Sequence, residues 1–147
     1  MWHVGAFDHT ENDDARGYMY IIDMKFIGTE LFRYVFSDLC VGSQYTFSAY
    51  IANIDKVSKN HKIPNVRFEV RNSLYENEVL AQFDTGEIGF FDQLTWLEYG
   101  VSFNPTTSSV VLLLLSNSEG VLGNNIAVDD IELHFCSSTL SNICLKG

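Results

Sequence analysis

The chain has 147 residues, of which 19 are acidic and 9 basic, giving a formal net charge of −10. This length corresponds to one domain that can bury a core without extra cross-links. The acidic balance argues against nucleic acid and anionic membranes as partners, because both attract basic surfaces, and it favours cations. No apolar run approaches the roughly 18 residues of a membrane span, so we expect no membrane insertion.

The composition favours strands, with 14% aromatic residues and only two prolines. Eight apolar runs of strand length are separated by turn-forming residues. They cover residues 17–24, 30–36, 44–53, 65–72, 78–85, 96–103, 109–117 and 125–135. Eight strands with almost no helical pattern predict an all-β fold, a two-sheet antiparallel jelly-roll β-sandwich.

Alternation within two of these runs predicts which side chains face the core. In 44–53 the odd-numbered residues from Tyr45 to Ile51 face inwards. In 65–72 the even-numbered residues from Val66 to Val70 do the same. The run 110–115 has no polar face, which predicts a strand that is covered on both sides, either a central strand or one that lies under a long loop.

The outward-facing residues of these runs supply one candidate ligand patch. Tyr50 offers an aromatic ring, and Asn53, Arg67 and Glu69 offer polar groups. A sugar site needs this combination of a ring surface and hydrogen-bonding side chains. The patch forms only if the two strands are neighbours. An ordinary outer sheet face with paired charges is an equally good interpretation.

Two acidic groups far apart in the sequence suggest a metal site. Oxygen-bearing side chains are dense in residues 8–17: Asp8, Thr10, Glu11, Asn12, Asp13 and Asp14. Asp129 and Asp130 interrupt the apolar alternation of the last strand, where unpaired charges are costly to bury. Ca²⁺ binds six to eight such oxygen ligands and would neutralise both groups. The alternative is a solvated acidic loop, with Asp129 bound by other groups.

Catalytic motifs are missing from the sequence. The four histidines are scattered, and there is no HExxH or GxSxG pattern. Asp129 and Asp130 are neighbours on a strand and are expected to point to opposite faces, so they cannot flank one glycosidic bond. We therefore expect no enzyme. The three cysteines, Cys40, Cys136 and Cys144, fit neither a zinc motif nor CxxC and suggest one pair plus one left over.

Several motifs together resemble a known module. They are DHT followed by GYM, then LCVGSQYTFSAYIAN, PNVRFEV, a TGEI turn, WLEYGVSF and GNNIAVDDIEL. From Trp2 to Cys136 the chain resembles galactose-binding-like jelly-roll modules of secreted bacterial surface and adhesin-like proteins. It is also similar to MAM domains of animal cell-surface proteins. The loop ENDDAR is one residue longer than the usual spacing, so the choice between Asp13 and Asp14 stays open.

The resemblance implies a structural Ca²⁺ that links the first loop to the last strand. The matching ligands are Asp8, Thr10, Asp13, Asp14, Gly17, Asp129 and Asp130. It also implies a Cys40–Cys136 disulfide. A reduced protein and a local Cys136–Cys144 bridge are the alternatives.

Taken together, these features predict a jelly-roll binding module over residues 1–136 and a C-terminal extension over residues 137–147. The expected function is a calcium-stabilised, non-catalytic binding or adhesion module of a larger extracellular or cell-surface protein. A glycan is the first expected ligand. The alternative is a MAM-like structural spacer or protein-interaction domain without a glycan site, with a cell-surface protein as partner.

Overall fold

The computed structural model describes residues 20–23, 27–55, 63–89, 91, 93–118 and 125–137. These residues form eight strands. In chain order they are β1 (Tyr20–Asp23), β2 (Glu30–Phe36), β3 (Gln44–Asn53), β4 (Asn65–Asn72), β5 (Val79–Glu87), β6 (Leu97–Phe103), β7 (Val110–Ser116) and β8 (Asn125–Ser137). The described residues contain no helix, and hence none able to cross a membrane.

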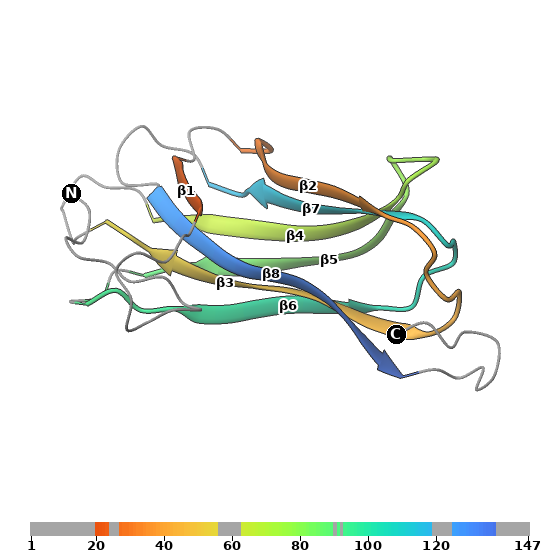
Figure 1. The fold of residues 1–147 in the computed structure, drawn as a ribbon. Helices are drawn as coiled ribbons and strands as arrows, with labels where there is room; N and C mark the ends of the chain where they lie inside the picture. The colour runs from red at the N-terminus through yellow and green to blue at the C-terminus, as the bar shows by residue number, and fades with distance from the viewer. Residues whose placement is uncertain are drawn as a thin grey trace.

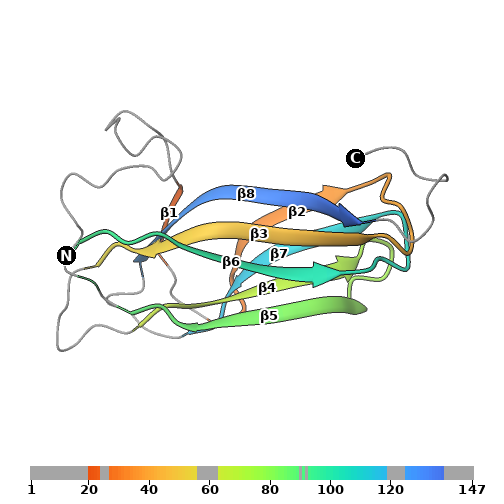
Figure 2. The same cartoon turned by 90° about the horizontal axis from the view of Figure 1, so that it is seen from below.

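The strands form two four-stranded sheets, ordered β1-β8-β3-β6 and β2-β7-β4-β5, and every described pairing is antiparallel. Figure 1 shows the sheets stacked face to face. In Figure 2, β2 and β8 lie along one side of the sandwich, and β5 and β6 along the other. The predicted all-β jelly-roll sandwich is confirmed.

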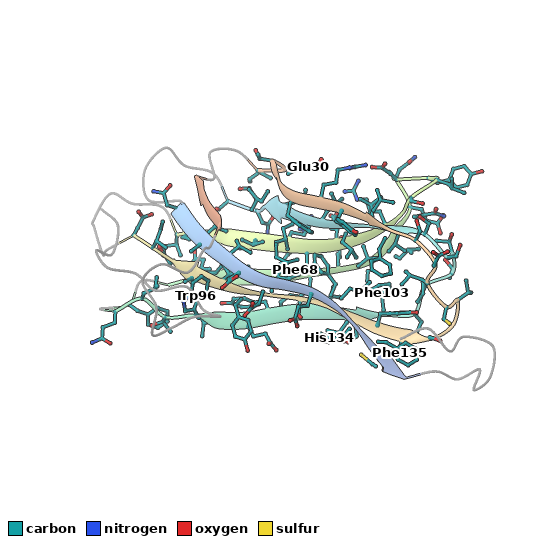
Figure 3. The ribbon with its side chains drawn as sticks, in the orientation of Figure 1. Glu30, Phe68, Trp96, Phe103, His134 and Phe135 are labelled. Atoms are coloured by element: carbon teal, nitrogen blue, oxygen red, sulfur yellow. The ribbon has the colours of Figure 1, made fainter. Side chains whose placement is uncertain are left out.

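The core lies between the sheets and is built by the predicted alternation. The side chains of Phe47 on β3 and Phe68 on β4 are fully buried, and their ring centroids are 5.3 Å apart. Figure 3 shows Phe68 in the space between the sheets. Burying such side chains supplies the main driving force for folding, about 1.5–3 kcal/mol for each large apolar side chain.

Strand β7 is central, as its uniformly apolar sequence predicts. Leu112 and Leu114 join the main core, whereas Val111, Leu113 and Leu115 form a separate buried cluster. Leu113 lies opposite Arg33 of β2 and Glu69 of β4 in the strand register. The aliphatic stems of long charged side chains can cover apolar residues on an outer sheet face in this way.

Gly100 of β6 lies opposite Ser48 of β3. A Cβ atom at residue 100 would come within 2.9 Å of the Phe47 carbonyl oxygen and 3.0 Å of the Ser48 Cβ. Only a glycine therefore fits between the two strands without displacing backbone.

We expect Gly100→Ala to lower the free energy of unfolding by about 1–3 kcal/mol, as overpacking does in other proteins. Gly89→Ala is the matched control, because nothing lies within 4 Å of a Cβ at residue 89. Urea denaturation of both variants measures the difference. Equal stabilities of the two variants would contradict the steric argument.

The cysteines differ from expectation. Cys136 is a free, exposed thiol, so the predicted Cys40–Cys136 bond is wrong. The Cys136 Sγ lies 3.1 Å from Thr46 Oγ1 on an outer sheet face, whereas Cys40 is buried in the core. Cys40 is disulfide-bonded, and its backbone N–H donates to the Tyr45 phenol oxygen at 2.9 Å.

We expect peptide mapping of the unreduced protein to link Cys40 to Cys144, the one remaining cysteine. Reduction should destabilise the fold, on the order of 4 kcal/mol by the chain-entropy model for a long closed loop. Native alkylation should label Cys136 alone. Labelling of Cys40 in the unreduced native protein would contradict this pairing.

Candidate functional site

Asp129 and Asp130 form a β-bulge in β8. Tyr50 of β3 pairs with Asp129 and Ser48 pairs with Glu132, so one β3 residue faces two residues of β8. Asp130 takes a positive φ of 47°, a conformation that Asp tolerates better than most residues. The Asp130 N–H donates to Asp129 Oδ1 at 2.8 Å.

The bulge reverses which residues of β8 face the core. Ile126 and Val128 are buried in the core before it, and Ile131 and Leu133 pack against the core after it. The inward side therefore changes from even to odd residues. Asp129 and Asp130 lie where the inward side changes, and both residues are half-buried.

The edge of β8 is open beyond the bulge. β1 pairs with β8 only from Asn125 to Val128, so no described strand flanks β8 on that side from Asp129 onwards. The edge strand of the facing sheet is β2. The two edges enclose a groove of about 740 Å³.

The groove is lined by mainly aromatic residues on one side and by both apolar and acidic residues on the other. From β2 and β7 it is lined by Phe32, Tyr34, Phe36 and Leu112. From β8 it is lined by the residues from Val128 to Leu133, including Asp129, Asp130 and Glu132. Its volume is within the usual range for small-ligand sites.

Tyr34 is the most accessible ring in the groove, at 54% exposed. Its centroid lies 6.4 Å from that of Phe36, with the rings tilted by 51°. Exposed rings of this kind can pack against the C–H face of a ligand, and carboxylates opposite them can accept hydrogen bonds from hydroxyl groups.

The residues of the predicted ligand patch do not come together. β3 and β4 belong to different sheets, so Tyr50 and Asn53 are separated from Arg67 and Glu69. The condition that the strands be neighbours is not met. The single patch expected from the sequence is therefore wrong.

Each of these four residues has a role in its own sheet. Asn53 is buried and donates through Nδ2 to the Ile88 carbonyl at 3.0 Å. Arg67 forms two hydrogen bonds to Asp84, at 2.6 and 3.0 Å, and this contact lowers the Asp84 pKa. Glu69 is buried and accepts from Arg71 Nε at 2.6 Å.

Tyr50 lies on the outer face of the β1-β8-β3-β6 sheet. A hydrogen bond to Glu98 is the main cause of a raised Tyr50 pKa, with burial and the negative charges of Asp130 and Glu132 adding to it. Glu132 is also paired with His134, which Figure 3 labels. This face is rich in carboxylates.

The expected calcium ligands lie only partly within the described residues. Asp129 and Asp130 are described, but Asp8, Thr10, Asp13, Asp14 and Gly17 are outside the described ranges. The described part of the chain contains no group of three or more His, Cys, Asp or Glu side chains that could hold a metal. The calcium hypothesis therefore stays a prediction.

The aromatic wall was not anticipated from the sequence. Phe32, Tyr34 and Phe36 recur at every second position of β2, and this alternation was the available signal. It predicts a common face for the three rings but cannot say whether another strand covers them.

No known family model matches the chain, and no curated protein matches it either. The family resemblance seen in the sequence motifs thus stays a prediction.

Solved structures of similar fold exist. The C-terminal domain of EclA, titled a sugar-binding protein, has a TM-score of 0.57 and 15% identity, covering 80% of this chain and 79% of that one. The enzymatically active domain of bacteriophage CBA120 tailspike protein 4 has a TM-score of 0.50 and 11% identity, covering 80% of this chain but 15% of that one.

A family 35 carbohydrate-binding module from an environmental isolate has a TM-score of 0.42 and 13% identity, covering 80% of this chain and 77% of that one. At these identities the likeness concerns the fold alone. The protein is a jelly-roll β-sandwich.

Proposed function

We propose that the protein is a non-catalytic carbohydrate-binding module and that its sugar binds in the groove between β2 and β8. One observation carries the proposal. Three aromatic residues of β2 line one side of a groove of about 740 Å³, and three acidic residues of β8 are among those that line the other side. Rings pack against the apolar face of a pyranose, and carboxylates accept hydrogen bonds from its hydroxyl groups.

The fold likeness to a domain titled a sugar-binding protein supports this function. The distribution of carboxylates supports a non-catalytic role. Most glycosidases place two carboxyl groups on either side of the scissile bond. Here all carboxylates of the groove come from β8, and the opposite wall is formed by Phe32, Tyr34, Phe36 and Leu112.

An extracellular or cell-surface location belongs to the same proposal. Structural disulfides persist mainly in oxidising compartments, and Cys40 is disulfide-bonded. An adhesion module of a larger surface protein would meet glycans there.

We expect Tyr34→Ala to weaken binding of the best ligand on a glycan array about tenfold, because a ring contact contributes roughly 0.5–1.5 kcal/mol. Asp130→Asn should weaken it as well, since Asn keeps the positive φ but loses the negative charge. Isothermal titration calorimetry with the array-selected glycan measures both effects.

Tyr75→Ala is the matched control, because Tyr75 is 68% exposed on the β4–β5 turn and does not line the groove. It should bind like the wild type. If no glycan binds, the MAM-like spacer or protein-interaction function replaces the proposal.

Structural calcium is the second part of the proposal. The donor chemistry fits, because Asp129 and Asp130 place two half-buried carboxylates together at an edge that β1 leaves open. The acidic loop of residues 8–17 would supply further oxygen ligands. A bound ion would offset the mutual repulsion of the two carboxylates.

Calcium at a hundredfold excess over Kd should stabilise the protein by about 2.7 kcal/mol, because it binds the folded state preferentially. We therefore expect chelation to lower the melting temperature by several degrees and Asp129→Asn to abolish this response. Glu132→Gln is the control and should keep it. Identical melting curves in calcium and in chelator would contradict the calcium site.

A further inference from the structure

The outer face of β6, β3 and β8 holds a second polar surface, which borders the groove at Glu132. Its polar side chains are mostly paired with one another. Thr46 Oγ1 and Ser102 Oγ are 2.8 Å apart, Tyr50 is hydrogen-bonded to Glu98, and Glu132 is bound to His134.

Ser48 is the exception on this face. It lies between Phe47 and Ala49, which are fully buried in the core, so strand alternation directs its hydroxyl to the outer side. Ser48 is only 8% exposed, yet among the described side chains no hydrogen-bond partner is found for its hydroxyl. A buried polar group without a partner is costly, and a ligand would remove that cost.

Gly100 leaves the outer face next to Ser48 without a side chain. It is the β6 residue opposite Ser48, and it has no side chain to cover the hydroxyl. On the other side Ser48 faces Glu132 of β8, and the next β6 residue on this face is Glu98. Directly opposite Cβ atoms in a sheet are about 5 Å apart and diagonal ones about 7–8 Å, so both carboxylates can reach a group bound at Ser48.

The charge of this face selects a cation. Strands β3, β6 and β8 contain no Lys or Arg. The hydrogen bond to Glu98 is the main cause of the raised Tyr50 pKa, and the negative charges of Asp130 and Glu132 add to it. A primary ammonium group has three donors, enough for the Ser48 hydroxyl and the two flanking carboxylates, and the Tyr50 ring beside it can add a cation–π contact.

We infer that this face carries a second binding site, centred on Ser48 and Gly100, for a primary ammonium group. Glu98 and Glu132 are its counter-charges. The centre of this site differs from the proposed sugar groove, because Ser48, Gly100 and Glu98 do not line that groove, and Glu132 is the one residue of the site that does.

The test is NMR titration of the whole chain at low salt with two probes, glucosamine and Nα-acetyl-lysine amide. Their N-acetylated forms, N-acetylglucosamine and Nα,Nζ-diacetyl-lysine amide, lack the positive charge. We expect the amine probes to shift the backbone amide signals of Ser48, Tyr50 and Gly100, with the effect falling as salt is added. The tighter probe identifies the source as an amino sugar or a lysine side chain.

Two variants test the chemistry. Ser48→Ala and Glu98→Gln should each weaken amine binding about tenfold. Ser48→Ala should leave the melting temperature unchanged or raised, because it removes a buried hydroxyl without a partner. Tyr34→Ala, a change in the groove, should leave amine binding unchanged.

Three results would overturn the inference. One is the absence of shifts with both amine probes, and another is equal shifts with the acetylated probes. The third is wild-type amine affinity in both Ser48→Ala and Glu98→Gln. Glycan binding in the groove is measured separately, so failure of one site leaves the other to be judged on its own data.

Discussion

The β-bulge at Asp129 and Asp130 is the constraint on which both candidate sites depend. In an uninterrupted strand, the phase of Ile126 and Val128 would direct Asp130 and Glu132 into the core. Burying such charges without partners costs several kcal/mol each. The positive φ of Asp130 avoids this cost, because it shifts the phase and lets Ile131 reach the core.

The short length of β1 determines where the sandwich is open. β1 pairs with β8 only as far as Val128, and β2 is the edge of the other sheet. The rings of β2 are consequently lined up at an edge and not sealed by a further described strand. Open strand edges also invite pairing with other chains. The carboxylates of β8 oppose self-pairing there, because two copies would bring like charges together.

The two sheets differ in their positively charged side chains. Strands β2 and β4 carry Arg33, Arg67 and Arg71, and each arginine is paired with a carboxylate. Exposed pairs of this kind contribute little to stability, typically about 0–1 kcal/mol each. Their stems have a second use, because Leu113 of β7 lies opposite Arg33 and needs cover. On β3, β6 and β8 no such cations balance the acids.

The sequence by itself determined the fold class, the eight strands and most of the core. Alternation in β3 and β4 predicted the burial of Phe47 and Phe68, and the uniformly apolar run of β7 predicted a central strand. These features depend on the local period of two between side chains and are readable from one strand at a time.

Only the tertiary structure decided which residues share a site. Tyr50 and Arg67 are both outward-facing, but strand order puts them on different sheets. Tyr34 and Asp130 are far apart in sequence, but two strand edges bring them to one groove. The bulge also turns Cys136 to the outer face, away from Cys40. Strand order, strand ends and a one-residue change of phase arise from long-range pairing, which no local pattern in the sequence encodes.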